Sequence, residues 1–126
     1  MFDFKNPVPD LFDAQAQQVA TRLSQEQRTN KPSQIRRFYD EICMWNERVN
    51  EDPKPEDRFK ELLPFIRMLN AKAAYANGRN PQLVDKYFVD LMRGCLKEVN
   101  DPDSMKHFKL FMEAVMGFYK QIRPKD

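Results

Sequence analysis

Glycine and β-branched residues are scarce in this sequence. Only 3 of its 126 residues are Gly, and it contains seven Val, four Ile and two Thr. Tight turns and strands depend on these residue types, so the composition argues against an all-β protein or a dinucleotide-binding α/β fold. Ten Phe, four Tyr and seven Met are present, however, and 41% of the residues are hydrophobic. This is enough apolar surface for the core of one domain.

The patterns of common catalytic and metal sites are also missing. The one histidine, His107, rules out two-histidine zinc motifs, and the sequence has no Gly-rich phosphate loop and no G-x-S-x-G elbow. We expect His107 to be a solvated or partly packed helix residue. We expect Glu113, which lies in an apolar run, to pair with a nearby Lys or Arg rather than to act as a catalytic acid. The sequence therefore predicts a binding or scaffold protein without catalytic residues, metal or cofactor.

The sequence also shows no secretory signal peptide and no membrane-spanning segment. Residues 1–10 carry acids and two prolines where a secretory signal would carry basic and apolar residues. No window approaches the roughly 20 apolar residues of a membrane span. We therefore expect a cytoplasmic protein that does not associate with membranes, with Cys43 and Cys95 as reduced, buried side chains.

Apolar residues repeat at helical spacing in five segments that prolines separate. The segments cover residues 10–27, 32–49, 56–77, 81–99 and 102–122. The pattern predicts an all-α fold, a single-domain bundle of about five amphipathic helices over residues 10–126, after an irregular segment at residues 1–9. The first segment has a thin apolar stripe, so we expect it to be only partly packed and residues 1–9 to be irregular or mobile. The fourth segment has the widest stripe and is the predicted central helix.

Helix boundaries follow from the residues between these segments. Asn80 and Asp101 each precede a proline, which is the pattern of an N-cap followed by a first-turn proline. Gly78 is typical of a left-handed residue that ends a helix. Pro64 is expected to kink or restart the third helix near Leu63, because it removes one backbone hydrogen bond and clashes with the preceding turn.

Charge is nearly balanced overall but unevenly distributed. The net charge is +2, yet residues 27–39, 62–84 and 114–125 contain cations and no acid. At about 100° per residue, Arg36 and Arg37 point away from the apolar stripe of their helix. On the third segment Met68, Lys72, Tyr75 and Arg79 form one line. Cations interleaved with an aromatic ring suit a sugar–phosphate backbone, so the sequence predicts a nucleic-acid surface here.

Three blocks together resemble a known family. They are Gln34–Glu41 (Q-I-R-R-F-Y-D-E), Leu69–Arg79, which ends in A-Y-A-x-G-R, and Phe108–Tyr119. Their order and spacing are similar to those of the small helical subunit of the type III-A CRISPR Csm effector complex, over residues 32–122.

The resemblance implies a five-helix bundle without an active site that serves in antiviral defence. Several copies would stack on one another beside the backbone and large subunits, along the duplex of guide RNA and target RNA. Basic side chains would contact the target RNA backbone. The residues that the blocks assign to this contact are Arg36, Arg37, Lys72 and Arg79, and Arg67 just upstream is a further candidate.

Head-to-tail stacking requires two different patches on each copy. Our candidates are Met44, Phe111, Phe118 and the N-terminal segment. Two alternatives remain open, namely a helical adaptor or regulator that binds only protein, and a helix-turn-helix DNA-binding protein with its turn at Gly78–Pro81. The apolar character of the fourth segment argues against the latter, because a recognition helix must be exposed. Convergence of Arg36, Arg37, Lys72 and Arg79 on one exposed surface would favour RNA. If these cations point to different sides, or into carboxylates, the RNA hypothesis is weakened sharply.

Overall fold

The computed structural model describes residues 2–126, which fold as an all-α bundle. A short π-helical turn, η1 (Leu11–Gln15), leads into α1 (Ala16–Leu23), and the other helices are α2 (Pro32–Glu51), α3 (Pro55–Gly78), α4 (Lys86–Lys97) and α5 (Pro102–Ile122). No strand is present among these residues. The predicted all-α fold of five helices is confirmed. None of the described helices is both long and apolar enough to cross a membrane.

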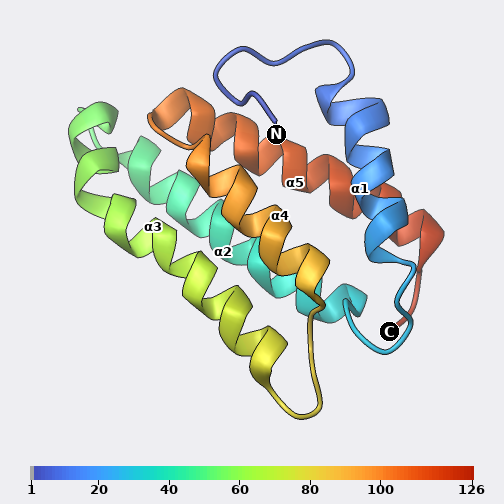
Figure 1. Cartoon of the computed structure of the whole chain (residues 1–126). Coiled ribbons are helices and arrows are strands. Elements are labelled where there is room, and N and C mark those ends of the chain that lie inside the picture. Colours follow the sequence, from blue (N-terminus) through green and yellow to red (C-terminus); the bar gives the residue numbers. More distant parts are fainter. Residues whose placement is uncertain (1) are drawn as a thin grey trace.

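Three helices lie side by side in the order α3, α2, α5, and α1 packs on the outer side of α5. α4 packs on α3 and lies across one face of this layer, in front of α2 (Figure 1). The helix with the most neighbours is α5, which packs against η1, α1, α2 and α3, so the prediction that the fourth segment is central was wrong.

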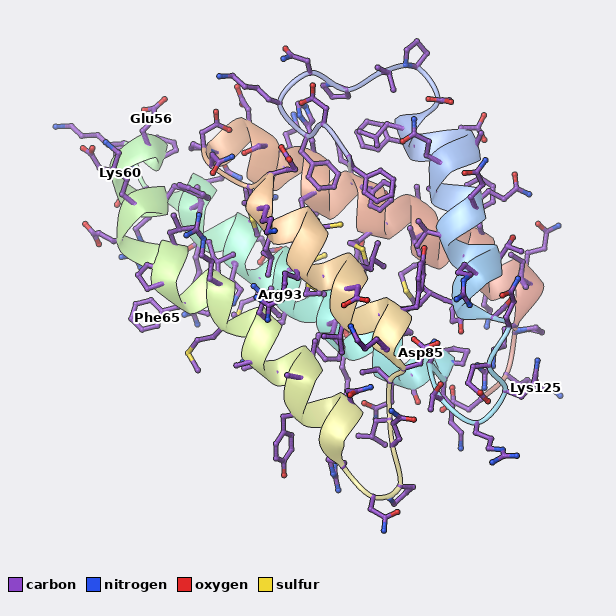
Figure 2. The ribbon with its side chains drawn as sticks, viewed as in Figure 1. Glu56, Lys60, Phe65, Asp85, Arg93 and Lys125 are labelled. Atoms are coloured by element: carbon purple, nitrogen blue, oxygen red, sulfur yellow. The ribbon has the colours of Figure 1, made fainter. Side chains whose placement is uncertain are left out.

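The connection between α3 and α4 differs from the prediction. Gly78 ends α3 without a positive φ, and the backbone leaves the helix through an extended Arg79. α4 begins at Lys86 rather than Pro81, because Asp85, labelled at the start of this helix in Figure 2, supplies the cap. Its carboxylate accepts a hydrogen bond from the Phe88 amide at 3.0 Å.

Of two other predicted helix boundaries, the one at Asp101 is confirmed and the one at Pro64 is not. Asp101 caps α5 as predicted, and it exchanges hydrogen bonds with Ser104 in a capping box. α3, in contrast, is not restarted at Pro64 and runs through it from Pro55 to Gly78.

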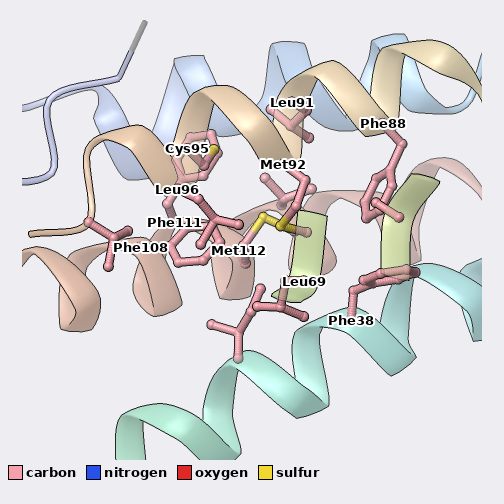
Figure 3. Packing of buried hydrophobic residues seen from close by; sticks show 14 of the residues in the cluster. Phe38, Leu69, Phe88, Leu91, Met92, Cys95, Leu96, Phe108, Phe111 and Met112 are labelled. Atoms are coloured by element: carbon pink, nitrogen blue, oxygen red, sulfur yellow. The ribbon is translucent and has the colours of Figure 1, made fainter. Parts of the chain in front are cut away.

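The core lies between α4 and the layer beneath it. α4 contributes Phe88, Leu91, Met92, Cys95 and Leu96, all buried (Figure 3). The Phe88 ring meets Phe38 of α2 at a centroid distance of 4.8 Å, edge to face. Both cysteines are free; Cys95 is fully buried, as predicted, and Cys43 is half-buried. Burial raises the pKa of the Cys95 thiol, which therefore stays protonated.

α1 is more deeply packed than its sequence suggested. Ala16, Val19, Ala20 and Leu23 are all buried, and α1 lies against α5. The two alanines have no bulk that would hold the helices apart, so α1 approaches α5 closely. The apolar stripe predicted from the sequence counted only the large side chains and left out these alanines. The expectation of a partly packed helix was therefore wrong.

Residues 2–10 form no helix but are held on α5. Phe4 is fully buried, with its ring 5.6 Å from those of Phe108 and Phe111. Its carbonyl oxygen lies 2.6 Å from Nδ1 of the half-buried His107, which is partly packed as expected. Phe111 is therefore buried beneath this segment and is not a surface patch for stacking, contrary to the prediction. Ile122, the last residue of α5, is 40% exposed.

A polar cluster holds the connection between α1 and α2. Arg123, buried just after α5, donates hydrogen bonds to the backbone carbonyls of Gln27 and Thr29 at 2.8 Å each, with longer ones to Glu26 and Asn30. The Tyr119 hydroxyl donates to the Asn30 carbonyl at 2.6 Å. Asn30 has a φ of 55°, a left-handed conformation that Asn tolerates better than most residues. Its side chain in turn accepts from the Asp85 amide at 3.0 Å.

Candidate nucleic-acid interface

An exposed groove between α2 and α3 brings three of the predicted cations together. Its volume is about 210 Å³. α2 lines it with Gln34, Arg37, Phe38 and Glu41; α3 and the residues after it contribute Lys72, Tyr75, Ala76, Arg79 and Leu83. Arg37, Lys72 and Arg79 thus share one surface although Arg37 and Lys72 are 35 positions apart in the sequence.

Helix geometry accounts for this convergence. Lys72, Tyr75 and Arg79 are spaced i, i+3 and i+7, so they lie on one side of α3. Arg37 and Glu41 are spaced i, i+4 on the facing side of α2. The two helices are neighbours joined by residues 52–54, and the chain reverses direction between them. The reversal places the first half of α2 beside the second half of α3.

Glu41 is the one carboxylate in the groove lining. Its two oxygens accept from Lys72 Nζ at 2.8 and 2.9 Å, and one of them also accepts from Trp45 Nε1 at 3.2 Å. An ion pair this exposed contributes about 0–1 kcal/mol, so it restrains Lys72 only weakly. Three cations and one carboxylate give the lining a net charge of +2.

The other two cations of the groove are not paired with acids. Within residues 2–126, neither Arg37 nor Arg79 lies within ion-pair distance of a carboxylate. The Arg79 guanidinium lies 6.0 Å from the centre of the Tyr75 ring. Both guanidinium groups are exposed, so their donors face solvent where an anion could reach them.

The remaining two predicted cations lie on other surfaces. Arg36 faces a hollow between α2 and α5 beside Lys120, and its Nε lies 3.3 Å from a carboxylate oxygen of Asp40. Arg67 precedes Lys72 by five residues, which turns it about 140° around α3, toward α4. The four cations Arg36, Arg37, Lys72 and Arg79 therefore do not all meet on one surface.

Sequence reasoning missed the neighbours of Arg67. Arg67 shares a shallow groove with Arg93 and Lys97 of α4, and Figure 2 shows Arg93 on α4 beside α3. The i, i+4 spacing of Arg93 and Lys97 was a signal for an exposed basic line on that helix. Their pairing with Arg67 depends on the contact between α3 and α4, which no local pattern reveals.

Two polar predictions outside the groove can be judged directly. Glu113 pairs with Lys109 at 2.8 Å, which confirms the predicted ion pair. The hydrogen bond from Lys109 lowers the pKa of the Glu113 carboxyl, and the Tyr39 hydroxyl also donates to it at 3.3 Å. α4 directs its apolar face into the core, so it is not placed like the recognition helix of a helix-turn-helix protein.

These observations define a small all-α protein with an exposed, cation-lined groove between two helices. The chain belongs to the Csm2 Type III-A family, which its sequence matches over residues 6–125. It is therefore a small subunit of a type III-A CRISPR effector complex, as the resemblance of residues 32–122 predicted, and the match also takes in residues 6–31. Comparisons with curated proteins and with solved structures gave no match.

Proposed function

We propose that this chain is a non-catalytic, RNA-contacting subunit of the effector complex in the cytoplasm. Several copies stack along the duplex of guide and target RNA, and the groove between α2 and α3 contacts the target strand. The observation that carries the proposal is the convergence of Arg37, Lys72 and Arg79 in one exposed groove.

The chemistry of the groove fits this role. Phosphate contacts position a nucleic acid without reading its sequence, and base pairing with the guide supplies specificity in guided complexes. Three cations make few contacts, so one copy binds weakly. Repetition along the duplex raises the effective affinity without any new kind of contact.

The test measures binding of single-stranded RNA by fluorescence anisotropy across a salt series. Each phosphate contact to a single strand contributes about −0.7 to the slope of log K against log salt, so three contacts predict a slope of about −2. The variant Arg37→Ala/Lys72→Ala/Arg79→Ala should lose most of this slope and keep its helicity. The matched control is Arg28→Ala/Lys60→Ala/Lys106→Ala, which removes three exposed charges outside the groove.

The same two triple variants are then assembled with the other subunits and guide RNA. The groove variant should weaken target binding more than the control does. Equal target affinity and equal salt dependence of the two assembled variants would contradict the proposal.

A protein-only adaptor is the second candidate, and exposed apolar side chains favour it. Phe65 is 52% exposed and points away from the bundle (Figure 2). Its ring stacks on Trp45 at a centroid distance of 6.3 Å. Met68 is 51% exposed. Met44 and Phe118, both half-buried, remain candidates for stacking between copies. If Phe65→Ser/Met68→Ser blocks assembly while the groove variant binds target normally, the adaptor explains the protein better.

A further inference from the structure

We infer that the groove between α2 and α3 also binds one unstacked RNA base, with its face against the ring of Tyr75. This inference rests on the proposed function, because the cations of the same groove hold the flanking phosphates. It adds a contact of a different chemical kind, one that depends on the base and not on charge.

Tyr75 is the most exposed large apolar side chain in the described part of the molecule. It is 71% exposed, whereas the rings of Phe4, Phe59, Phe88, Phe108, Phe111 and Tyr119 are buried. Its hydroxyl makes no hydrogen bond to any other residue of 2–126, so neither packing nor a polar contact within the chain accounts for its position. Exposed aromatic rings beside cations are the stacking platforms of proteins that bind single-stranded nucleic acids.

The groove beside Tyr75 has the size and lining for one flat ring. Its volume of about 210 Å³ lies below the roughly 300–1,000 Å³ of most small-molecule sites. Phe38, Ala76 and Leu83 give it an apolar floor. Gln34 also lines it, with an amide that both donates and accepts and can hydrogen-bond the edge of any base.

The cations of the groove indicate that the ligand also carries a negative charge. Arg79 lies at 6.0 Å from the Tyr75 ring centre, and Arg37 and Lys72 line the same groove. An aromatic face within a cationic groove matches a nucleotide, whose base and phosphate are joined through the sugar. A base inside a duplex is stacked on both faces and cannot reach this ring. The ligand is therefore an unpaired nucleotide, from single-stranded RNA or extruded from a duplex.

The test titrates the isotope-labelled full chain with a short uridine oligoribonucleotide and with an abasic oligomer of the same length, followed by NMR. Both oligomers should shift the signals of Arg37, Lys72 and Arg79 in a salt-dependent way. Only the uridine oligomer should move the Tyr75 ring protons upfield. It should also bind about 5- to 150-fold more tightly than the abasic oligomer, the range of measured base–aromatic stacking.

Three variants complete the design. Tyr75→Phe should keep the preference for uridine, because stacking needs the ring and not the hydroxyl. Tyr75→Leu should abolish the preference without changing the salt dependence. Phe65→Leu is the matched control, since it removes another exposed ring from α3 about 15 Å away along the helix axis.

The outcomes separate this inference from the proposed function. Absence of salt-dependent shifts at the three cations, together with equal target affinity of the two assembled triple variants, overturns the proposed function and the inference with it. Cation shifts with both oligomers, but no upfield shift at Tyr75, overturn the inference alone. If Tyr75→Leu leaves the uridine preference unchanged and instead impairs assembly of the complex, Tyr75 is a protein contact and the inference is wrong.

Discussion

α3 and α5, the two longest helices, use similar side chains in opposite ways. α5 buries the rings of Phe108, Phe111 and Tyr119, and the arginine that follows it is buried as well. α3 leaves Phe65 and Tyr75 exposed, and the arginine that follows it extends into solvent. One helix packs against most of the chain, while the other leaves its outer side exposed to solvent.

The two arginines show what decides between these roles. Arg123 directs its donors to backbone carbonyls, so its charge holds a loop. Arg79 has no carboxylate partner within residues 2–126 and lies beside an exposed ring, so its donors are available to an anion. In the sequence the two look alike, because each is a cation within a stretch that contains no acidic residue. The acceptors around the guanidinium group, and not the window, determine which arginine can bind a ligand.

The largest effect is expected from removing the structural arginine. Arg123→Met should lower the free energy of unfolding by about 3 kcal/mol, because hydrogen bonds to a charged group contribute about 1.5–3 kcal/mol each and are not additive. Urea denaturation followed by circular dichroism measures the change. Arg28→Met, in the loop that Arg123 holds, is the control and should stay within about 0.5 kcal/mol of wild type. Equal stabilities of the two variants would mean that Arg123 has no structural role, and the contrast with the exposed Arg79 after α3 would be lost.

A smaller effect is expected at the cap of α5. Asp101→Ala should cost about 0.5–2 kcal/mol, the usual range for losing an N-cap. The hydrogen bond from the Ser104 amide lowers the pKa of the Asp101 carboxyl. The stabilisation is therefore complete above the unfolded-state pKa of about 4 and is lost as the pH falls through the folded-state value.

Denaturation curves of wild type and Asp101→Ala from pH 7 to pH 2 measure this dependence. The stability difference between them should shrink at the acidic end. Asp103→Ala, two residues later, removes a carboxylate that does not cap the helix and should change stability less. A difference that is independent of pH would mean that Asp101 acts without its charge.

The smallest effect is expected in the groove. Glu41→Gln removes the carboxylate that pairs with Lys72 and raises the charge of the lining to +3. RNA affinity should rise about 1.5- to 5-fold, because exposed ion pairs are worth about 0.2–1 kcal/mol. Anisotropy at low salt measures it. Glu56→Gln makes the same charge change about 24 Å away along α3, beyond the screening length of about 8–10 Å, and should have no effect. Weaker binding by Glu41→Gln would show that Glu41 positions Lys72.

The number of helices and their approximate positions could be predicted from the sequence, because each helix has its own local signals. Asp101–Pro102 marked the start of α5, and helical spacing marked α2. The burial of Phe111 could not be predicted, because it depends on Phe4, more than one hundred positions away. The start of α4 at Lys86 was missed because Asn80–Pro81 matched the cap pattern, while Asp85 makes the actual capping bond.

Some features of the candidate site could likewise be predicted from local sequence, and others could not. Exposure of Arg37, Lys72 and Arg79 followed from the 3.6-residue period of each helix alone. Their meeting in one groove, the pairing of Lys72 with Glu41, and the separation of Arg36 and Arg67 follow from which helices are neighbours. Helix order in space is a property of the whole bundle, and no single segment encodes it.

The contact between Arg123 and the α1–α2 connection has a consequence for sequence variation. Main-chain oxygens are identical in every residue, so the guanidinium group fixes the path of residues 26–30 without using the side chains of Glu26 and Gln27. An exposed position of this loop whose side chain bonds no loop atom, such as Arg28, is therefore free to exchange one amino acid for another while the loop keeps its shape. A lineage could alter the chemistry of this surface and keep the bundle unchanged.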